Sequence, residues 1–308
     1  MNRNKVTIIG AGMVGSTTAF ALVASNIVEE VALIDNNKKL VKSQVMDLQH
    51  SVPFCGYSNI KVGTYNDVKD SQAVIIACGA SQKPGETRLD LLKKNSVIIK
   101  EIMPQIFKKN PKAVVIITTN PVDILTNIAY KMFPKKKSQI FGSGTILDSA
   151  RLRFLLGQKM LVDPKSVHAY IIGEHGDSEL ALWSTAMVGN AKIDNFYKLS
   201  DKEKETIFLQ AKNAAYAIIE GKQATYYAIA AGLVKIVRAV LYDENTVFTL
   251  SHPLTAEFGL KGVSLSLPVV VGSKGITRTI DMNISNSEKK LLISSANKLK
   301  QVEKKICH

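Results

Sequence analysis

Cysteine is scarce in this sequence, and no metal-binding motif is present. The three cysteines among the 308 residues, Cys55, Cys78 and Cys307, form no C-x-x-C pair. An odd number of scattered thiols excludes a disulfide scaffold, and their spacing offers no set of zinc ligands. We therefore expect no metal site and a location in a reducing compartment, the cytoplasm.

Long apolar runs and aromatic side chains are also rare. Apolar segments such as Val114–Ile117 have the length of a strand and fall far short of a bilayer-spanning helix. The first segment, Met1–Lys5, is polar and has no signal-peptide core. Aromatic residues make up 6% of the chain, too few for an obvious base-stacking surface. These absences argue against membrane and nucleic-acid partners.

Positive charge, in contrast, is abundant. The 40 lysines and arginines exceed the 26 acidic residues and give a net charge of +14. The densest cluster, Lys135–Lys137, follows Pro134, where a loop is expected, and the C-terminal lysines alternate with Glu288 and Glu303. This scatter indicates a solvated lysine-rich surface. Attraction of nucleic acid or of anionic metabolites is the alternative that the charge leaves open.

The first half of the chain alternates strand-like and helical segments. The apolar runs are rich in β-branched residues at both odd and even positions, which is typical of strands buried on both faces of a parallel sheet. The predicted strands are 6–9, 31–34, 73–77 and 114–118, and the predicted helices are 13–25, 38–48, 88–107 and 122–132. This rhythm predicts βαβ units, and hence an α/β fold with a Rossmann-type doubly wound parallel sheet.

The rhythm changes around residues 141–147. The second half is predicted to be α+β, with helices at 147–156 and 287–306 and a long amphipathic stretch at 201–238. Its predicted strands are 247–250, 263–271 and 278–280, after a strand-like stretch at 166–172. We therefore predict two domains, residues 1–142 and 143–308.

A glycine-rich motif follows the first predicted strand. Residues 10–15 read GAGMVG, a G-x-G-x-x-G that opens the first helix, and Asp35 ends the second strand 20 residues after Gly15. Gly10 permits a tight turn, Gly12 permits a close approach of the pyrophosphate, and Gly15 permits close packing of the helix on the sheet. The helix N-terminus favours the phosphates, and Asp35 suits the ribose hydroxyls. Because Asn36 and Asn37 offer no charge for a 2′-phosphate, the motif favours NAD over NADP.

A second set of polar residues points to proton transfer. His175 lies between glycines in GEHGD after a predicted strand, and Asp148 and Arg151 share a helix face. An aspartate paired with a histidine raises the pKa of the imidazole, and an arginine binds a carboxylate bidentately. Gln82 and Arg88 belong to a Pro-Gly loop after the third predicted strand, placed to cover a cleft. Taken singly, His175 could be structural, and Asp148–Arg151 an ordinary ion pair.

From end to end the chain resembles the L-lactate dehydrogenase/malate dehydrogenase family, and most closely its bacterial L-lactate dehydrogenases. The matching motifs are GAGMVG at 10–15, GASQKPGETRLDLL at 79–92, TTNPVD at 118–123, GTILDSARLR at 144–153, IIGEHGDSE at 171–179 and TYYAIA at 225–230.

The resemblance implies a role for each matching residue in a reversible transfer of hydride between NADH and pyruvate, the last step of fermentative glycolysis. It implies that His175 exchanges the proton, Asp148 stabilises the imidazolium and Arg88 polarises the ketone. The implied substrate-binding residues are Gln82, Arg88, Asn120, Arg151 and Thr225. The implied NAD-binding residues are Gly10, Gly12, Met13, Val14, Gly15, Asp35, Asn120 and Ile229.

Gln82 carries the choice between substrates. Malate dehydrogenases of the family have an arginine at this position, which meets the second carboxylate of oxaloacetate. A neutral Gln82 would leave that carboxylate unpaired, which disfavours oxaloacetate. We therefore expect pyruvate and L-lactate as substrates. A malate dehydrogenase or a broader 2-oxoacid reductase is the alternative, and a non-catalytic NAD-binding sensor is a remote one.

Arg153 and His168 match a regulatory site. In bacterial L-lactate dehydrogenases the corresponding residues face a subunit interface and bind fructose 1,6-bisphosphate. Arg153 lies about 200° around the helix from Arg151 and so faces away from the active site. The resemblance thus implies a homotetramer with a shared anion site, near Lys165. The alternative is a pair of interface residues that bind no effector.

Overall fold

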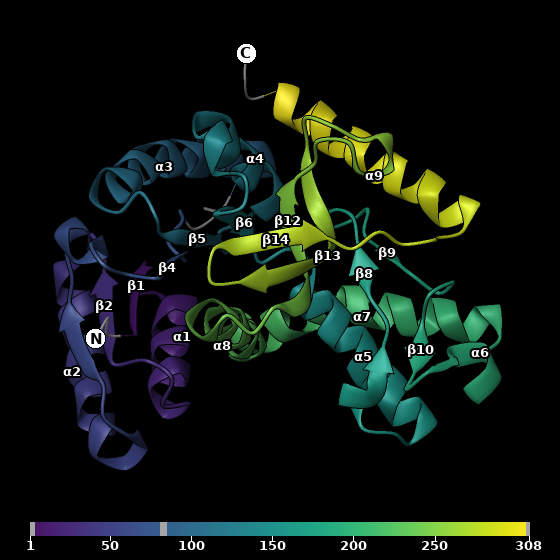
Figure 1. Cartoon of the computed structure of the whole chain (residues 1–308), viewed down its shortest axis with the longest axis horizontal. Coiled ribbons are helices and arrows are strands. Elements are labelled where there is room, and N and C mark those ends of the chain that lie inside the picture. The colour runs from purple at the N-terminus through teal and green to yellow at the C-terminus, as the bar shows by residue number, and fades with distance from the viewer. Residues whose placement is uncertain (1–3, 81–84, 306–308) are drawn as a thin grey trace.

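The computed structural model describes residues 4–80 and 85–305, so Gln82 and Cys307 lie outside the described residues. Its largest sheet has the strand order β14-β13-β12-β6-β5-β4-β1-β2-β3 (Figure 1). The six strands of the first half pair in parallel in the order β3-β2-β1-β4-β5-β6. They are β1 (Lys5–Ile9), β2 (Glu30–Ile34), β3 (Asn59–Val62), β4 (Ala73–Ile76), β5 (Val114–Ile117) and β6 (Ile140–Gly142). This is the doubly wound Rossmann order, as predicted.

The two faces of this sheet bury different apolar residues. In β4, Val74 and Ile76 belong to one core cluster, whereas Ala73 and Ile75 belong to the other. One face is covered by α3 (Arg88–Lys109) and α4 (Val122–Met132), and the other by α1 (Met13–Ala24) and α2 (Lys38–Cys55). Because both faces of the sheet are buried, these strands are apolar at both odd and even positions.

The second half extends the same sheet with antiparallel strands. Ser251 in β12 (Thr246–Pro253) pairs with Gly142 in β6, and β13 (Ser264–Gly272) and β14 (Gly275–Thr279) follow at the edge. Around them lie α5 (Ile146–Met160), α6 (Ile193–Phe196), α7 (Asp201–Lys222), α8 (Tyr227–Tyr242) and α9 (Asn286–Lys304). Two small sheets join β8 (Ile171–Ile172) to β9 (Leu180–Ala181), and β7 (Val167–His168) to β10 (Met187–Val188) and β11 (Ala191–Lys192).

Four short 3₁₀ turns complete the described elements, and they lie in the connections between helices and strands. They are Tyr65–Val68, Pro134–Lys136, Pro164–Ser166 and Glu257–Gly259. None of the described helices is both long and apolar enough to cross a membrane.

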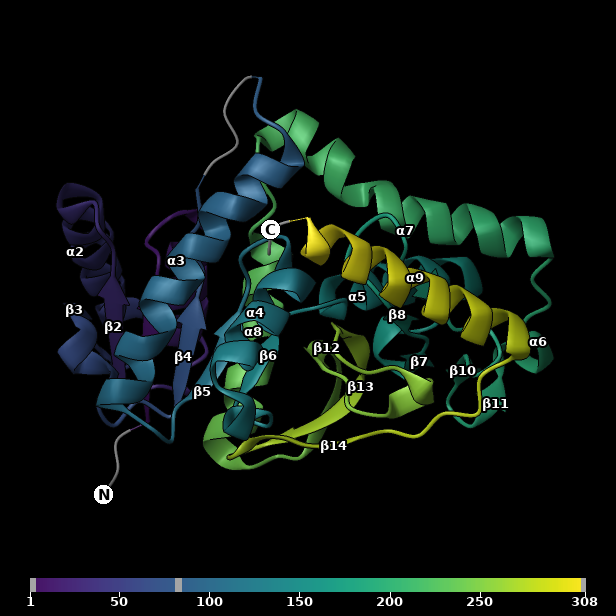
Figure 2. The ribbon, with the colours of Figure 1, turned by 90° about the horizontal axis from the view of Figure 1, so that it is seen from above.

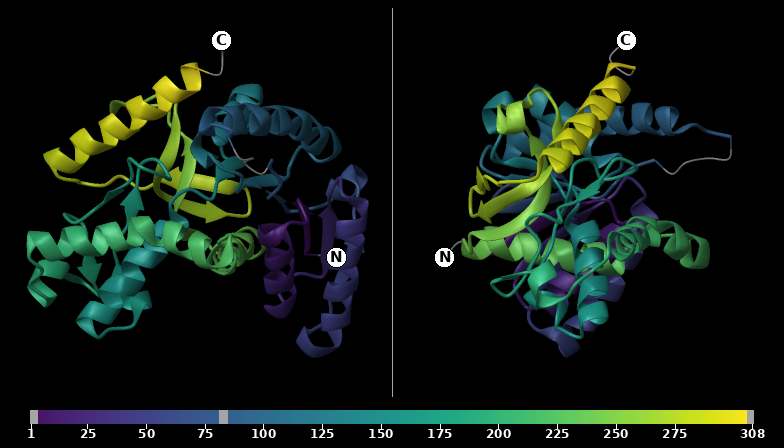
Figure 3. Two further views of the ribbon diagram at one scale, coloured as in Figure 1. Left: turned by 180° about the vertical axis from the view of Figure 1, so that it is seen from behind. Right: turned by 90° about the vertical axis from the view of Figure 1, so that its right-hand side faces the viewer.

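The amphipathic stretch over 201–238 forms two helices. Gln223 adopts a left-handed conformation with φ +70° and ends α7, and α8 begins at Tyr227. The reversal allows α7 to pack on α5 while α8 packs on α1 (Figure 2; Figure 3, left). The short strands β3 and β6 were not predicted. In β3 two of the four residues are exposed, so the strand lacks a continuous apolar run.

Candidate active site

Glycine is needed at residues 10, 12 and 15 for two different structural reasons. A Cβ on Gly10 or Gly15 would collide with backbone atoms, of Cys78 and Ala77 or of Gly10 respectively, whereas a Cβ on Gly12 meets no atom within 4 Å. Gly10 also has φ +114°, which favours glycine. Gly10 and Gly15 are therefore required by the turn and by helix packing, and Gly12 leaves open space above it.

The N-terminus of α1 has no capping side chain. Its N-cap residue is Gly12, so no side chain accepts a hydrogen bond from the first amides of the helix. Free amides and the positive end of the helix dipole suit a phosphate group. The residues present therefore fit the pyrophosphate of a dinucleotide.

Asp35 lies just beyond β2 and is held by the turn. Its Oδ2 accepts a hydrogen bond from the amide of Ala11 at 2.7 Å, and its Oδ1 accepts one from the amide of Asn37 at 2.8 Å. These bonds orient the carboxylate at the carboxyl edge of the sheet, close to the glycine turn. This position suits a ribose diol and supports the choice of NAD.

Asn95 on α3, which no sequence motif indicates, joins the ends of two neighbouring strands. Its Oδ1 accepts from the amide of Ala80 after β4, and its Nδ2 donates to the carbonyl of Asn120 after β5, both at 2.8 Å. Asn95 is buried, whereas Asn120 is exposed. The bonds of Asn95 thus hold the backbone of Asn120 at the edge where its side chain is accessible.

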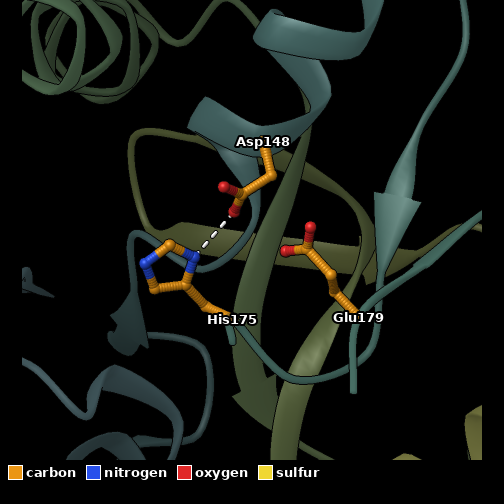
Figure 4. Close-up of side chains that lie close together, drawn as sticks. All are labelled: Asp148, His175 and Glu179. Carbon is orange, nitrogen blue, oxygen red and sulfur yellow. Dashed lines mark hydrogen bonds and ion pairs between the residues drawn. The ribbon is translucent and has the colours of Figure 1, made fainter. Parts of the chain in front are cut away.

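The predicted pairing of His175 with Asp148 is present in the structure. Asp148, in the first turn of α5, accepts a hydrogen bond at 2.6 Å from His175 Nδ1, and this requires the Nδ1–H form of the ring (Figure 4). The side chain of Asp148 is 3% exposed and that of His175 is 27% exposed. His175 Nε2 has no hydrogen-bond partner among the described residues, so it can exchange a proton with a ligand.

The pair has a strong electrostatic effect on both groups. Burial by itself lowers the pKa of His175, but the Asp148 carboxylate and its hydrogen bond outweigh this and raise the pKa to about 9. Burial by itself raises the pKa of Asp148, and His175 and Arg151 outweigh it, so the pKa is lowered. His175 is therefore cationic at neutral pH and able to donate a proton.

Asp123 on α4 fixes the loop of His175 from the first half of the chain. Its Oδ2 accepts a hydrogen bond at 2.7 Å from the backbone amide of His175. Asp123 is buried, and burial raises its pKa to about 6 although the His175 amide favours the carboxylate. The residue lies in the TTNPVD motif, but its contact with a loop 52 residues away leaves no local signal in the sequence.

Arg151 lies on the other side of Asp148. Its Nη1 donates to Asp148 Oδ1 at 2.9 Å, and its side chain is 13% exposed. Within the described chain its remaining guanidinium nitrogens have no partner, so two donors are available to a ligand carboxylate. The predicted shared face of Asp148 and Arg151 is thus realised.

Glu179 completes a compact group with Asp148 and His175, and no spacing in the sequence indicates it. Ligand-capable atoms of Asp148, His175 and Glu179 all lie within 4.8 Å of one another (Figure 4). Both oxygens of Asp148 already accept hydrogen bonds, from Arg151 and His175. We therefore interpret the group as a proton and charge network rather than a metal centre.

Other predicted residues lie at the ends of helices. Arg88 is the first residue of α3, whose capping box is formed by Thr87 and Asp90. Thr225 is half-buried in the turn between α7 and α8, and Ile229 in α8 packs against the apolar cluster of the sheet.

Arg153 points away from Arg151, as predicted. It donates from Nε to the carbonyl of Pro164 at 3.2 Å and from Nη2 to that of Lys165 at 3.3 Å. His168, in the following strand β7, is exposed. Arg153 thus contacts the backbone of the turn that precedes β7, and His168 lies three residues after Lys165 in the sequence.

Two family models match this chain in succession. Residues 4–142 match the lactate/malate dehydrogenase NAD-binding domain, and residues 145–308 match the lactate/malate dehydrogenase alpha/beta C-terminal domain. The chain belongs to the lactate/malate dehydrogenase family.

Similar members of the family cover the whole chain. An L-lactate dehydrogenase of Thermoanaerobacter sp. is 46% identical over 97% of this chain and 98% of its own length, and that of Thermus aquaticus is 44% identical over 96% and 97%. The solved minor L-lactate dehydrogenase of Enterococcus mundtii superposes with a TM-score of 0.96 at 35% identity and covers 99% of both chains. A lactate dehydrogenase from a Medee basin deep-sea metagenome library has a TM-score of 0.95 at 38% identity, and covers 99% of this chain and 100% of that one.

Proposed function

We propose that this member of the lactate/malate dehydrogenase family is an NAD-dependent L-lactate dehydrogenase that interconverts pyruvate and L-lactate. The observation that carries the proposal is the network in which Asp148 binds both His175 and Arg151. It combines a cationic proton donor with a guanidinium suited to a carboxylate, the two groups that a 2-oxo acid needs. The names of the similar proteins support the same activity.

The cofactor would bind at the carboxyl edge of the parallel sheet. Gly10, Gly12, Gly15 and the amides of Met13 and Val14 would hold the pyrophosphate, and Asp35 the adenosine ribose. Asn120 and Ile229 would lie against the nicotinamide, which supplies the hydride when NADH is bound. We further propose that residues 1–142 form the NAD-binding domain and residues 143–308 the substrate domain, as the matched family models support.

In pyruvate reduction, His175 donates the proton. Nδ1 is bound to Asp148, so the proton leaves from Nε2 to the ketone oxygen as that oxygen gains charge. Asp148 orients the ring and stabilises its cation before the transfer. In lactate oxidation, neutral His175 accepts the hydroxyl proton at the same nitrogen.

Arg151 binds the substrate carboxylate. Its bond to Asp148 holds the guanidinium beside the proton donor, which sets the spacing between the bound carboxylate and the reacting carbon. We propose that Arg88 polarises the ketone, and that Thr225 and Asn120 complete the pocket. A planar cation can bind both carboxylate oxygens, whereas a lysine would bind only one.

Substrate choice is assigned to Gln82. A neutral side chain provides no partner for the second carboxylate of oxaloacetate, so pyruvate is favoured. The test is kcat/KM for NADH oxidation with pyruvate and with oxaloacetate. We expect a large preference for pyruvate that Gln82→Arg reverses, whereas the neutral control Gln82→Met keeps it.

Each other outcome of that experiment has a definite meaning. A ratio near one in the native chain would remove Gln82 as the determinant and favour a broader 2-oxoacid reductase. Preference for oxaloacetate would indicate a malate dehydrogenase. The absence of turnover with both substrates, although NADH binds, would favour the NAD-binding sensor.

We propose a homotetramer that binds fructose 1,6-bisphosphate at Arg153 and His168. Exposed apolar side chains on α1 and α2, among them Phe20, Met46 and Phe54, support self-association. Light scattering measures the molar mass of the assembly and thus tests the tetramer.

Fructose 1,6-bisphosphate should raise activity at low pyruvate, and Arg153→Ala should abolish the response. No response in the native protein would leave Arg153 only its bonds to the carbonyls of Pro164 and Lys165.

The proposed location is the cytoplasm. Cys55 and Cys78 are free thiols in the structure, which is consistent with a reducing compartment.

A further inference from the structure

Glu179 lies directly behind the proton donor. It precedes β9 and ends the loop that carries His175, and its amide donates to the carbonyl of Gly176 at 3.2 Å. The residue is 7% exposed, and its carboxyl group points toward Asp148 and His175 (Figure 4). The backbone on both sides is held, because β9 pairs with β8. The carboxyl group is therefore fixed at the network rather than directed to solvent.

One oxygen of the Glu179 carboxyl group is buried without a hydrogen-bond partner in the described part of the chain. Its Oε1 is inaccessible and has no hydrogen-bond partner among the described residues. An ionised carboxylate in such a position is costly, whereas a neutral carboxyl group is much less so. Burial, followed by the negative charge of Asp148, raises the pKa of Glu179 to about 8. Both effects favour the protonated form of the carboxyl group.

The charged groups facing Glu179 come from three elements. Asp148 and Arg151 lie on α5, His175 on its own loop, and Lys212 on α7. Three cations oppose the rise in its pKa, and each has another partner. His175 and Arg151 bind Asp148, and Lys212 donates to the carbonyl of Asp177 at 2.8 Å. An ionised Glu179 would stabilise the cation of His175 and so raise the pKa of the imidazole.

We propose that Glu179 is a positioning residue that acts through His175, as a buried carboxyl group whose charge sets the proton affinity of the imidazole. While Glu179 is neutral, the imidazolium is stabilised by Asp148 and Asp123, and His175 releases its proton more readily. Once Glu179 ionises, a further negative charge stabilises the imidazolium. This favours the protonated form that pyruvate reduction needs, and opposes the neutral form that lactate oxidation needs. The effect on turnover rests on the proposed function; the effect on proton affinity does not.

The direct test is an NMR titration of His175 in labelled protein, with Glu179→Gln as the variant. The chain has five histidines, so the resonance is assigned by its loss in His175→Ala. We expect Glu179→Gln, which keeps size but removes the titrating charge, to lower the midpoint of the His175 titration. The control Glu205→Gln removes an exposed carboxylate of α7 and should leave the midpoint unchanged.

The kinetic test is the pH profile of kcat/KM in both directions. As the pH increases, pyruvate reduction falls and lactate oxidation rises, and in Glu179→Gln both changes should occur at lower pH. The ratio of the rate of reduction to the rate of oxidation should therefore decrease severalfold above pH 8. Glu179→Asp, which keeps a carboxyl group, should restore most of the native profile. A merely structural role would lower both rates at every pH and leave the profile in place.

Identical His175 midpoints in the native protein and in Glu179→Gln would overturn the proposal. If Glu179→Gln does not fold, Glu179→Ala, which also removes the carboxyl group, is compared with the native protein, and a lowered midpoint supports the proposal while an unshifted one refutes it. Because the NMR midpoint needs no substrate, a shift in a protein that fails to reduce pyruvate would refute the proposed function and leave the role of Glu179 standing.

Discussion

The nucleotide edge of the sheet, formed by the glycine turn and Asp35, differs from the His175 network in what holds its residues together. At the edge, Asp35 binds the amide of Ala11 in a backbone turn between two neighbouring strands of one sheet. His175 instead depends on side chains of two helices, Asp148 on α5 and Asp123 on α4, 52 residues away in the first half of the chain. The first region is set by backbone shape and the second by side chains that the fold brings together. Substitutions should therefore act on them differently.

The largest expected effect is that of His175→Ala. Loss of the proton donor should lower kcat for pyruvate by about 10⁴-fold, the upper range for general acid catalysis. The nucleotide edge is separate, so the Kd of NADH, measured by fluorescence titration, should not change. Weakened NADH binding in this variant would show that the two regions are coupled.

Asp148→Asn should change the pH dependence. His175 has a pKa of about 9 and donates only below it, so native pyruvate reduction should fall, and lactate oxidation rise, as the pH increases through about 9. Removing the carboxylate should move the midpoints of both pH profiles toward the unperturbed value near 6.5. Stopped-flow measurements of kcat/KM against pH give these midpoints. Midpoints that stay near pH 9 would assign the high proton affinity of His175 to another group.

Arg151→Lys should act on substrate binding. The variant retains the charge but loses the planar pair of donors, so KM for pyruvate should rise about 30-fold, the equivalent of one charged hydrogen bond of about 2 kcal/mol. Pyruvate reduction should still fall as the pH increases through about 9, since His175 and Asp148 are unchanged. An unaltered KM would place the carboxylate elsewhere.

The smallest effects are expected within the glycine turn, and they separate packing from binding. Gly15→Ala should lower the free energy of unfolding by about 2 kcal/mol, because its Cβ would collide with the carbonyl of Gly10. Gly12→Ala is the matched control for stability, since its Cβ meets nothing. That variant should fold normally and bind NADH about tenfold more weakly, a loss of about 1.4 kcal/mol. Urea unfolding and NADH titration of both variants test the distinction.

Much of the fold follows from periodicity alone. Four of the six parallel strands were predicted because strands buried on both faces need apolar residues at every position. The edge strand β3 was missed, since half of its residues are exposed, and the three-residue β6 is too short to form a pattern. The break between α7 and α8 was also missed. It depends on the left-handed Gln223 and on packing against two different helices, α5 and α1.

The sequence by itself determined the residues whose chemistry is local or carried by a motif: the glycine turn, Asp35, and the shared helix face of Asp148 and Arg151. The pairing of Asp148 with His175 was implied by the family resemblance, and the fold makes the contact. Only the tertiary structure placed Asp123 under the His175 amide, Asn95 between two strand ends, and Glu179 behind the imidazole. The physical reason is burial. A turn or a helix face is a property of neighbouring residues, whereas the proton affinity of a buried group depends on charges brought to it by distant elements.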